Sequence, residues 1–248
     1  MLPRHIALAC LWRTFFINCA NTARGMQQIG LAFVLAPALH CLYPEGEARA
    51  RAFARHGGHS NTHVFMLPLY AGIIISLEEQ IANRTLPETA LGQIRETLGT
   101  TLSALGDSFF SGTLLPLWAL SSIFLLLGGH VCLTVSLTLT ALILLNIFRP
   151  LSFFAALRYG IPVLLWVRRL DLVNWGTRLK LVNAVLVALV VWQLHLALHL
   201  SWLTFTGGIA AVLAAAWLIG RRGLPRLLLW AAGVSILLLA ATGSSPYE

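Results

Sequence analysis

Charged residues are absent from two long stretches of this sequence, residues 108–148 and 181–220, each about 40 residues long. A helix of about 20 apolar residues crosses the hydrocarbon core of a bilayer, so each stretch is long enough for two crossings. Only 10% of all residues are charged, against about 25% in an ordinary soluble domain. Such surfaces would aggregate in water, whereas a helix in lipid satisfies its own backbone hydrogen bonds. The sequence therefore predicts an integral membrane protein.

Acidic residues are scarce, with 9 against 17 basic residues, and the second half of the chain has the fewest. Beyond Asp107 the only acids are Asp171 and Glu248, while basic residues cluster between apolar runs, at residues 168–180 and 221–226. Basic segments that bracket apolar runs are typical of the cytoplasmic loops of membrane proteins. Because these residues do not line one face, they do not indicate a nucleic-acid surface, and we expect no nucleic-acid partner.

Paired cysteines and catalytic signatures are also missing. The four cysteines have no CxxC spacing, which argues against a zinc site or a disulfide framework. His56, His59 and His63 lie close in the sequence, but no cysteine or carboxylate completes a ligand set, so structural roles are favoured over metal binding. No dinucleotide-binding, Walker, nucleophile-elbow or zincin motif occurs. We therefore expect no catalytic residue, no metal and no cofactor.

The first part of the chain alternates between polar and apolar segments. Residues 25–43 and 64–77 are apolar, but both are too short or too interrupted for a simple crossing, and they indicate buried, interfacial or re-entrant helices. Residues 43–59 are polar and rich in alanine and arginine, which favours a helix at the cytoplasmic surface, broken at Gly57 and Gly58. Short helices that are buried, interfacial or re-entrant are therefore predicted for this part.

The region near Asp107 separates this part from an apolar remainder. A helix is predicted to begin at Pro87 and Glu88, and the Gly-, Ser- and Thr-rich residues 99–113 indicate a broken helix or a hairpin around Gly106 and Asp107. Further helices are expected at about residues 114–127, 131–148, 151–167, 181–203, 205–220 and 227–241. We therefore predict an all-α, polytopic integral membrane protein, with short re-entrant or interfacial helices in residues 1–116 and transmembrane helices in residues 117–248.

The candidate functional residues are polar side chains among apolar segments, where an ionisable group is costly unless it faces a cavity or a partner. They are Asn61, Thr62, Glu78, Glu79, Asp107, Ser108 and Thr113. The Asp107 carboxylate could accept hydroxyl hydrogen bonds from a sugar, bind a cation, or cap the helix that follows. Glu78 and Glu79 are adjacent on a predicted helix and point about 100° apart, so we expect only one of them to line a cavity.

Short motifs at these positions are similar to those of one known family. In chain order they are Gly25-Met26-Gln27, Pro37-Ala38-Leu39, Leu42-Tyr43-Pro44-Glu45, Asn61-Thr62, Leu77-Glu78-Glu79-Gln80, Ala82-Asn83, and Gly106-Asp107-Ser108 with Phe110, Gly112-Thr113 and Pro116. Their order and spacing resemble the IID membrane subunit of the mannose/fructose/sorbose family of the bacterial phosphotransferase system. The resemblance covers about residues 11–116. The chain departs from the family's usual residues at Arg24, at Leu115 and at Ser111, where the family usually has a tryptophan.

The resemblance implies a non-catalytic helical subunit in the bacterial cytoplasmic (inner) membrane. Such a subunit pairs with a IIC subunit, as a trimer of IIC–IID pairs in the lipid bilayer, to form the path of a hexose. In that family, separate cytoplasmic IIA and IIB units phosphorylate the sugar through their own histidines at the expense of phosphoenolpyruvate. No histidine here is therefore expected to carry a phosphoryl group. The residues expected near the sugar are Asp107, Asn61, Thr62, Glu78 or Glu79, Ser108 and Thr113, with Gln27 in support.

Two other functions are consistent with the sequence. A divergent subunit that has lost transport would act as a membrane scaffold or a regulatory subunit, and the departures from the family pattern favour this alternative. An unrelated membrane enzyme that uses Asp107 and Ser108 would need a base and an oxyanion-stabilising group, and the sequence shows neither.

Overall fold

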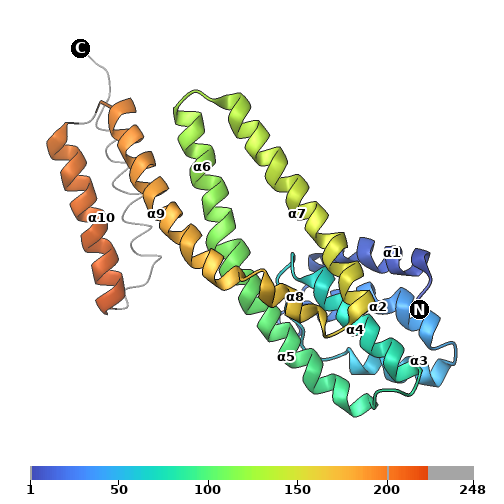
Figure 1. Ribbon diagram of the computed structural model, residues 1–248. Coiled ribbons are helices and arrows are strands. Elements are labelled where there is room, and N and C mark those ends of the chain that lie inside the picture. Colours follow the sequence, from blue (N-terminus) through green and yellow to red (C-terminus); the bar gives the residue numbers. More distant parts are fainter. Residues whose placement is uncertain (1, 200, 223–248) are drawn as a thin grey trace, which may run out of the picture. The chain divides into compact units, whose positions relative to one another are not determined.

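The computed structural model describes residues 2–199 and 201–222, and the regular structure within them is helical (Figure 1). The first helices are α1 (Arg4–Arg13), the 3₁₀ helix η1 (Thr14–Ala20), α2 (Gln28–Leu42), α3 (Gly46–Arg55), α4 (Leu67–Ala82) and α5 (Glu88–Gly106). They are followed by the π-helix η2 (Asp107–Leu114), α6 (Leu115–Leu127), α7 (Val131–Tyr159), α8 (Val163–Arg169), α9 (Leu172–Ala197) and α10 (Trp202–Arg222). The predicted all-α fold class is confirmed. The chain up to Val190 forms one compact unit, and a second unit begins at Val191.

Helix α4 is the centre of the first unit, because most of its side chains are buried. It packs against α7, α2 and α5. Gly72 allows α7 to approach closely, since a Cβ atom at this position would lie only 2.6 Å from the Phe153 carbonyl oxygen and 2.7 Å from the Ala156 Cβ. Of the alternatives expected for residues 64–77, the structure therefore shows a helix buried inside the protein.

The other two short helices of the first part form where the sequence predicts them. Helix α2 buries one stripe of apolar residues at helical spacing and exposes Ile29 and Phe33 on its other side, as a partly covered helix does. Helix α3 is largely exposed and ends at Arg55, before the two glycines at residues 57 and 58. Both helices are too short to cross a bilayer alone.

The chain does not turn back near Asp107, so the alternative of a hairpin there is wrong. Helix α5 begins at Glu88, directly after Pro87 as predicted, and passes without interruption into η2 and α6. Gly106 itself has helical angles, with φ −64° and ψ −46°. In an apolar setting the backbone must satisfy its own hydrogen bonds, so the Gly-, Ser- and Thr-rich segment stays helical and changes its winding from α to π.

The break expected between residues 148 and 151 is also wrong, because α7 continues through Arg149 and Pro150. Arg149 is buried against the N-terminal segment, where its Nη2 donates to the Thr14 carbonyl oxygen at 3.0 Å. Its guanidinium carbon lies 3.7 Å from the centre of the Phe15 ring. Because η1 supplies these partners, the arginine is accommodated within a helix and does not mark a loop.

The basic segment 168–180 is mostly helical, contrary to the loop expected there. Helix α9 begins at Leu172, only three residues after α8 ends. Asp171 occupies the turn with φ +50°, and both of its carboxylate oxygens accept hydrogen bonds from the Asn174 side chain at 2.9 Å. A sharp turn stabilised in this way lets α9 start well before the residue 181 that was expected.

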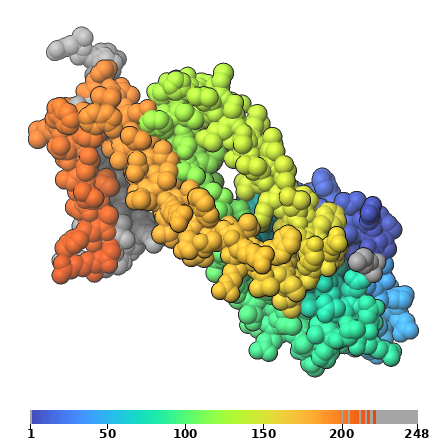
Figure 2. Space-filling model, in the orientation of Figure 1, coloured from blue at the N-terminus to red at the C-terminus, as the bar shows by residue number. Residues whose placement is uncertain are grey.

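Three stretches of the described chain are long and apolar enough to cross a membrane: Glu88–Leu127, Val131–Tyr159 and Val163–Ala197. Within the first unit, α6 and α7 run side by side as a hairpin (Figures 1 and 2). Both helices expose many of their large apolar side chains. Such faces suit lipid or an apolar partner. Helix α10 agrees with the helix expected at residues 205–220, and the one expected at residues 227–241 lies outside the described residues.

Candidate functional site

A cavity of about 530 Å³ opens between α5 and the loop that precedes α4. Two residues singled out from the sequence meet there: Asn61 comes from the loop, and Asp107 is the first residue after α5. Both side chains are exposed. Most of the residues that line it carry polar side chains, and a volume of this size falls within the range of about 300–1,000 Å³ that is typical of small-molecule sites.

Helix α5 presents a polar stripe to the cavity. Arg95, Gly99, Ser103 and Asp107 all line it, and their spacing of four residues places them on one helical face. The Ser103 hydroxyl donates to the Asp107 Oδ2 at 3.4 Å. The regular spacing back from Asp107 is a sequence signal that could have identified Arg95, which the sequence analysis missed.

Gln27 holds the loop that carries Asn61. The Gln27 backbone N–H donates to the Ser60 carbonyl oxygen at 2.8 Å, and its side-chain Oε1 accepts from the Thr62 backbone N–H at 2.8 Å. Its Nε2 donates to the Asn18 Oδ1 at 3.2 Å. Gln27 is only 5% exposed, so its amide is used within the protein. Gln27 therefore lies beneath the loop and outside the cavity lining.

Arg95 ties the same loop to α5. Its Nη1 donates to the Arg55 carbonyl oxygen at 3.1 Å and its Nη2 to the His59 carbonyl oxygen at 3.3 Å. The Tyr70 hydroxyl, which reaches the cavity from α4, donates to the Arg95 carbonyl oxygen at 3.4 Å. Burial raises the pKa of Tyr70 to about 12, so its hydroxyl stays protonated. Arg95 and Tyr70 thus brace the cavity wall from α5 and α4.

The loop continues past the cavity into a contact with η2. The His63 ring stacks on Phe110 with 5.3 Å between ring centres, and its Nε2 lies 3.1 Å from the Ser111 hydroxyl. Burial lowers the pKa of His63. Gly106 permits this contact, because a Cβ atom there would lie 2.3 Å from the His63 Cβ. The loop and the helix that carry Asn61 and Asp107 are thereby held together.

Thr62, Ser108 and Thr113 take positions around this contact, outside the cavity lining. Thr62 is 1% exposed, and its hydroxyl has no hydrogen-bond partner among the described residues. Thr113 is fully buried and donates its hydroxyl to the Ser108 carbonyl oxygen at 2.9 Å, inside η2. Ser108 is exposed. The structure therefore brings Asn61 and Asp107 together at the cavity. Thr62, Ser108 and Thr113 lie next to them in the sequence or in η2 but do not line the cavity.

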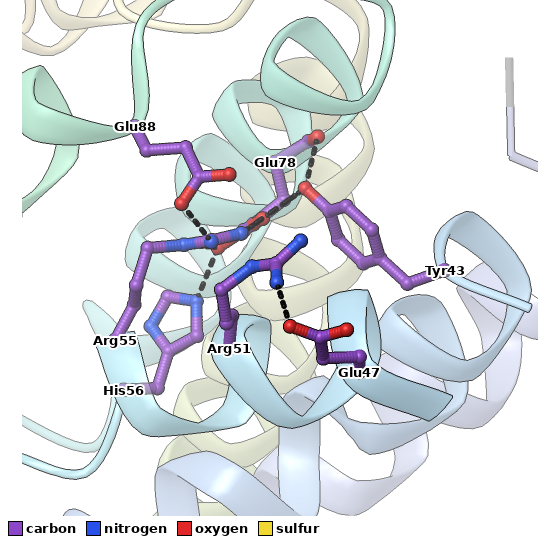
Figure 3. Close-up of polar contacts among 7 residues, drawn as sticks. All are labelled: Tyr43, Glu47, Arg51, Arg55, His56, Glu78 and Glu88. Carbon is purple, nitrogen blue, oxygen red and sulfur yellow. Dashed lines mark hydrogen bonds and ion pairs between the residues drawn. The ribbon is translucent and has the colours of Figure 1, made fainter. Parts of the chain in front are cut away.

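Glu78 lies in a separate, buried cluster of polar groups (Figure 3). Its Oε2 accepts from the Tyr43 hydroxyl at 2.7 Å and from the Arg55 Nη2 at 2.8 Å, and its Oε1 accepts from the His56 Nε2 at 2.7 Å. Arg55 also pairs with Glu88 at 2.8 Å. The cluster therefore joins α3 to α4, to the residue after α2, and to the first residue of α5.

The charge of Glu78 is stabilised by its partners. Burial raises the pKa of this carboxyl, but the hydrogen bonds from His56, Arg55 and Tyr43 outweigh burial and hold the pKa to about 2. Burial and the neighbouring carboxylate raise the pKa of Tyr43. Glu79, on the adjacent helical face, is half-buried. Neither glutamate lines the cavity, so the expectation that one of them would does not hold for this cavity.

The cavity offers groups that bind hydroxyls. A carboxylate accepts hydrogen bonds, an amide both donates and accepts them, and the serine and threonine hydroxyls along α5 do the same. Within residues 2–199 and 201–222, no group of three or more His, Cys, Asp or Glu side chains is arranged to hold a metal ion. The arrangement suits a neutral polyhydroxylated ligand whose hydroxyls replace water at Asp107 and Asn61.

The sequence matches the family model described as the PTS system mannose/fructose/sorbose family IID component over residues 2–169. The chain is 34% identical over 139 residues to the PTS system mannose-specific EIID component of Escherichia coli (strain K12), covering 54% of this chain and 47% of that protein. It is 30% identical over 147 residues to the fructose permease IID component of Bacillus subtilis (strain 168), covering 59% and 52%. The chain thus spans about half the length of the curated relatives it matches.

Solved structures share the fold at low sequence identity. One, described as a membrane protein, has a TM-score of 0.77 and 20% identity over 97% of both chains. Another is a chain of the mannose transporter ManYZ in complex with microcin E492, with a TM-score of 0.60 and 20% identity over 98% of both chains. The fold of this chain is therefore shared with solved membrane proteins.

Proposed function

This chain belongs to the IID components of the mannose/fructose/sorbose family of the phosphotransferase system, and we propose from this premise that it forms, with a IIC subunit, the translocation path of a hexose. It is a membrane transport subunit. The family resemblance noted from the motifs is confirmed, and the match extends beyond residues 11–116 to residue 169. The hexose is of the mannose/fructose/sorbose class.

The observation that carries this proposal is the meeting of Asp107 and Asn61 at one polar cavity. We assign the Asp107 carboxylate to accept hydrogen bonds from two sugar hydroxyls, and the Asn61 amide to bind a third. Gln27 fixes the loop that carries Asn61. Glu78 stabilises the helices behind the cavity, and Ser108 and Thr113 act through the winding of η2.

The partners of this proposal follow from the family to which the chain belongs. We assign phosphoryl transfer to cytoplasmic IIA and IIB units, and the assembly to a trimer of IIC–IID pairs in the bacterial inner membrane. The exposed apolar faces of α6 and α7 are available to lipid and to the IIC subunit.

A second candidate, a non-transporting scaffold or regulatory subunit, is favoured by one observation. Ser111, which stands where the family usually has a tryptophan, contributes only a small hydroxyl that lies against His63. An aromatic ring near a sugar path would stack on the sugar, and this chain has none at that position.

Labelled-hexose uptake separates the two functions. The chain would be expressed with its cognate IIC, IIA and IIB units, and Asp107→Asn would be compared with Asp171→Asn, whose carboxylate lies in the α8–α9 turn. We expect the complex with the wild-type chain to take up the hexose. Asp107→Asn should lower uptake about tenfold or more, because hydrogen bonds to charged groups contribute about 1.5–3 kcal/mol each. Asp171→Asn should change uptake little. Absence of uptake by the wild-type complex would support the scaffold instead.

A further inference from the structure

The segment η2 is a π-helix inside an otherwise continuous helix, and Asp107 is its first residue. π winding is rare and occurs mostly as short insertions in α-helices, frequently at functional sites. In an apolar setting, side chains and neighbouring helices must satisfy the backbone groups that such a change of winding frees. Two carbonyl oxygens of η2 have partners of this kind, one from Thr113 within the segment and one from Asn183 of α9.

Asn183 contacts η2 from α9, which lies along η2 for two helical turns. At Gly176, a Cβ atom would lie only 3.6 Å from the Thr113 Oγ1 and 3.8 Å from a carbon of the Phe109 ring, so α9 is already close there. Seven residues later, on the same face of α9, the Asn183 Nδ2 donates to the Thr113 carbonyl oxygen at 3.0 Å. Both contacts lie within the first unit.

The burial of Asn183 argues that this one hydrogen bond matters. The side chain is 8% exposed, and its Oδ1 has no hydrogen-bond partner among the described residues. A buried amide oxygen without a partner destabilises a protein, and a leucine would avoid that cost in an apolar helix. Asparagine donates a hydrogen bond to the Thr113 carbonyl oxygen, which a leucine could not do.

We infer that Asn183 is a positioning residue that fixes the π winding of η2 and, through it, the place of the Asp107 carboxylate at the cavity. A return from π to α winding shifts the register by one residue, which rotates the flanking helical faces by about 100° relative to each other. Asn183 lies beyond residues 2–169, which the family model matches, so this link couples the apolar remainder of the chain to the site. Only its effect on the sugar rests on the proposed function.

Hydrogen–deuterium exchange of the amides of η2 tests the winding itself. The intact complex with its IIC subunit would be compared in lipid nanodiscs as wild type, Asn183→Leu, Asn183→Gln and Asn146→Leu. Asn146 is the matched control, because within the described part of the chain its side chain bonds only to the Leu142 carbonyl oxygen of its own helix, at 2.8 Å. We expect about threefold to tenfold faster exchange of η2 in Asn183→Leu, partial recovery in Asn183→Gln and no change in Asn146→Leu. Wild-type exchange in Asn183→Leu would overturn the inference.

Uptake by the same variants tests the consequence for the sugar. Asn183→Leu should raise the KM for the hexose by about threefold or more and change the maximal rate by less than about twofold, since it displaces a binding group. Faster exchange with an unchanged KM, while Asp107→Asn still impairs uptake, would overturn the coupling to the cavity. If Asp107→Asn has no effect either, the sugar site of the proposed function fails, and faster exchange still establishes Asn183 as the residue that holds η2.

Discussion

At the scale of single residues, two acids that look alike in the sequence have opposite surroundings. Glu78 is 1% exposed, and three donors occupy its oxygens. Asp107 is exposed at a cavity, and among the described residues only the Ser103 hydroxyl donates a hydrogen bond to it, at 3.4 Å. A carboxylate with all of its partners inside the protein holds helices together, whereas one with free lone pairs can accept the hydroxyls of a ligand. No sequence pattern distinguishes the two, because the partners of Glu78 come from distant segments.

Removing the charge of Glu78 should destabilise the fold strongly. Glu78→Gln leaves the Arg55 guanidinium, which is 15% exposed, without its buried partner, and breaking a buried ion pair typically costs about 3–5 kcal/mol. Glu47→Gln is the matched control, because Glu47 forms an exposed pair with Arg51 on α3 and exposed pairs contribute little (Figure 3). Thermal unfolding of the purified protein in detergent measures both. Equal melting temperatures for the two variants would contradict this role.

Acid should destabilise the wild-type protein through the same residue. The pKa of Glu78 is about 2 in the folded protein, against an ordinary value of 4.5, so the unfolded chain takes up the proton first. Its contribution is complete above about pH 4.5 and is lost as the pH falls toward about 2, and it amounts to about 3 kcal/mol. Melting temperatures measured between pH 6 and pH 3 should fall more steeply for wild type than for Glu78→Gln. Parallel curves would refute the assignment.

At the scale of helices, sequence patterns predicted the short elements well and the transitions between long ones poorly. The bounds of α2 and α3 and the start of α5 follow from apolar spacing, glycines and Pro87, which act locally. The continuity of α7 through Pro150 could not be predicted, because Arg149 finds its partners in η1, more than a hundred residues earlier. The π winding of η2 likewise depends on a contact with α9.

One glycine controls how closely the loop that carries Asn61 approaches α5. Gly106→Ala places a Cβ atom 2.3 Å from the His63 Cβ, so the loop must move, and overpacking of this kind costs about 1–3 kcal/mol. Gly92→Ala is the control in the same helix, where a Cβ atom meets nothing within 4 Å. We expect a lower melting temperature for Gly106→Ala, and an unchanged or higher one for Gly92→Ala because alanine favours helix. If Gly106→Ala melts at the wild-type temperature, the loop moves without loss of stability, which would contradict this role of Gly106.

At the scale of the whole molecule, membrane character and family follow from the sequence, and the shape of the cavity does not. Charge-free stretches predicted the membrane character and short motifs predicted the family, because both kinds of feature are local properties of the chain. Asn61 and Asp107 were identified as polar residues in apolar surroundings, but their meeting at one cavity required the folded positions of α4 and α5. Tyr70 was missed, since it does not stand out until the helices are packed. Arg95 was missed although its spacing back from Asp107, in steps of four residues, places it on the same helical face.

The most direct test is equilibrium binding of a labelled mannose-class hexose to the purified IIC–IID complex, measured for wild type and for Asp107→Asn. If Asp107 and Asn61 line the path of the sugar, the dissociation constant should rise about tenfold or more in the variant, since a hydrogen bond to a charged acceptor contributes about 1.5–3 kcal/mol. An unchanged dissociation constant, in a complex that still binds the hexose, would contradict the central claim.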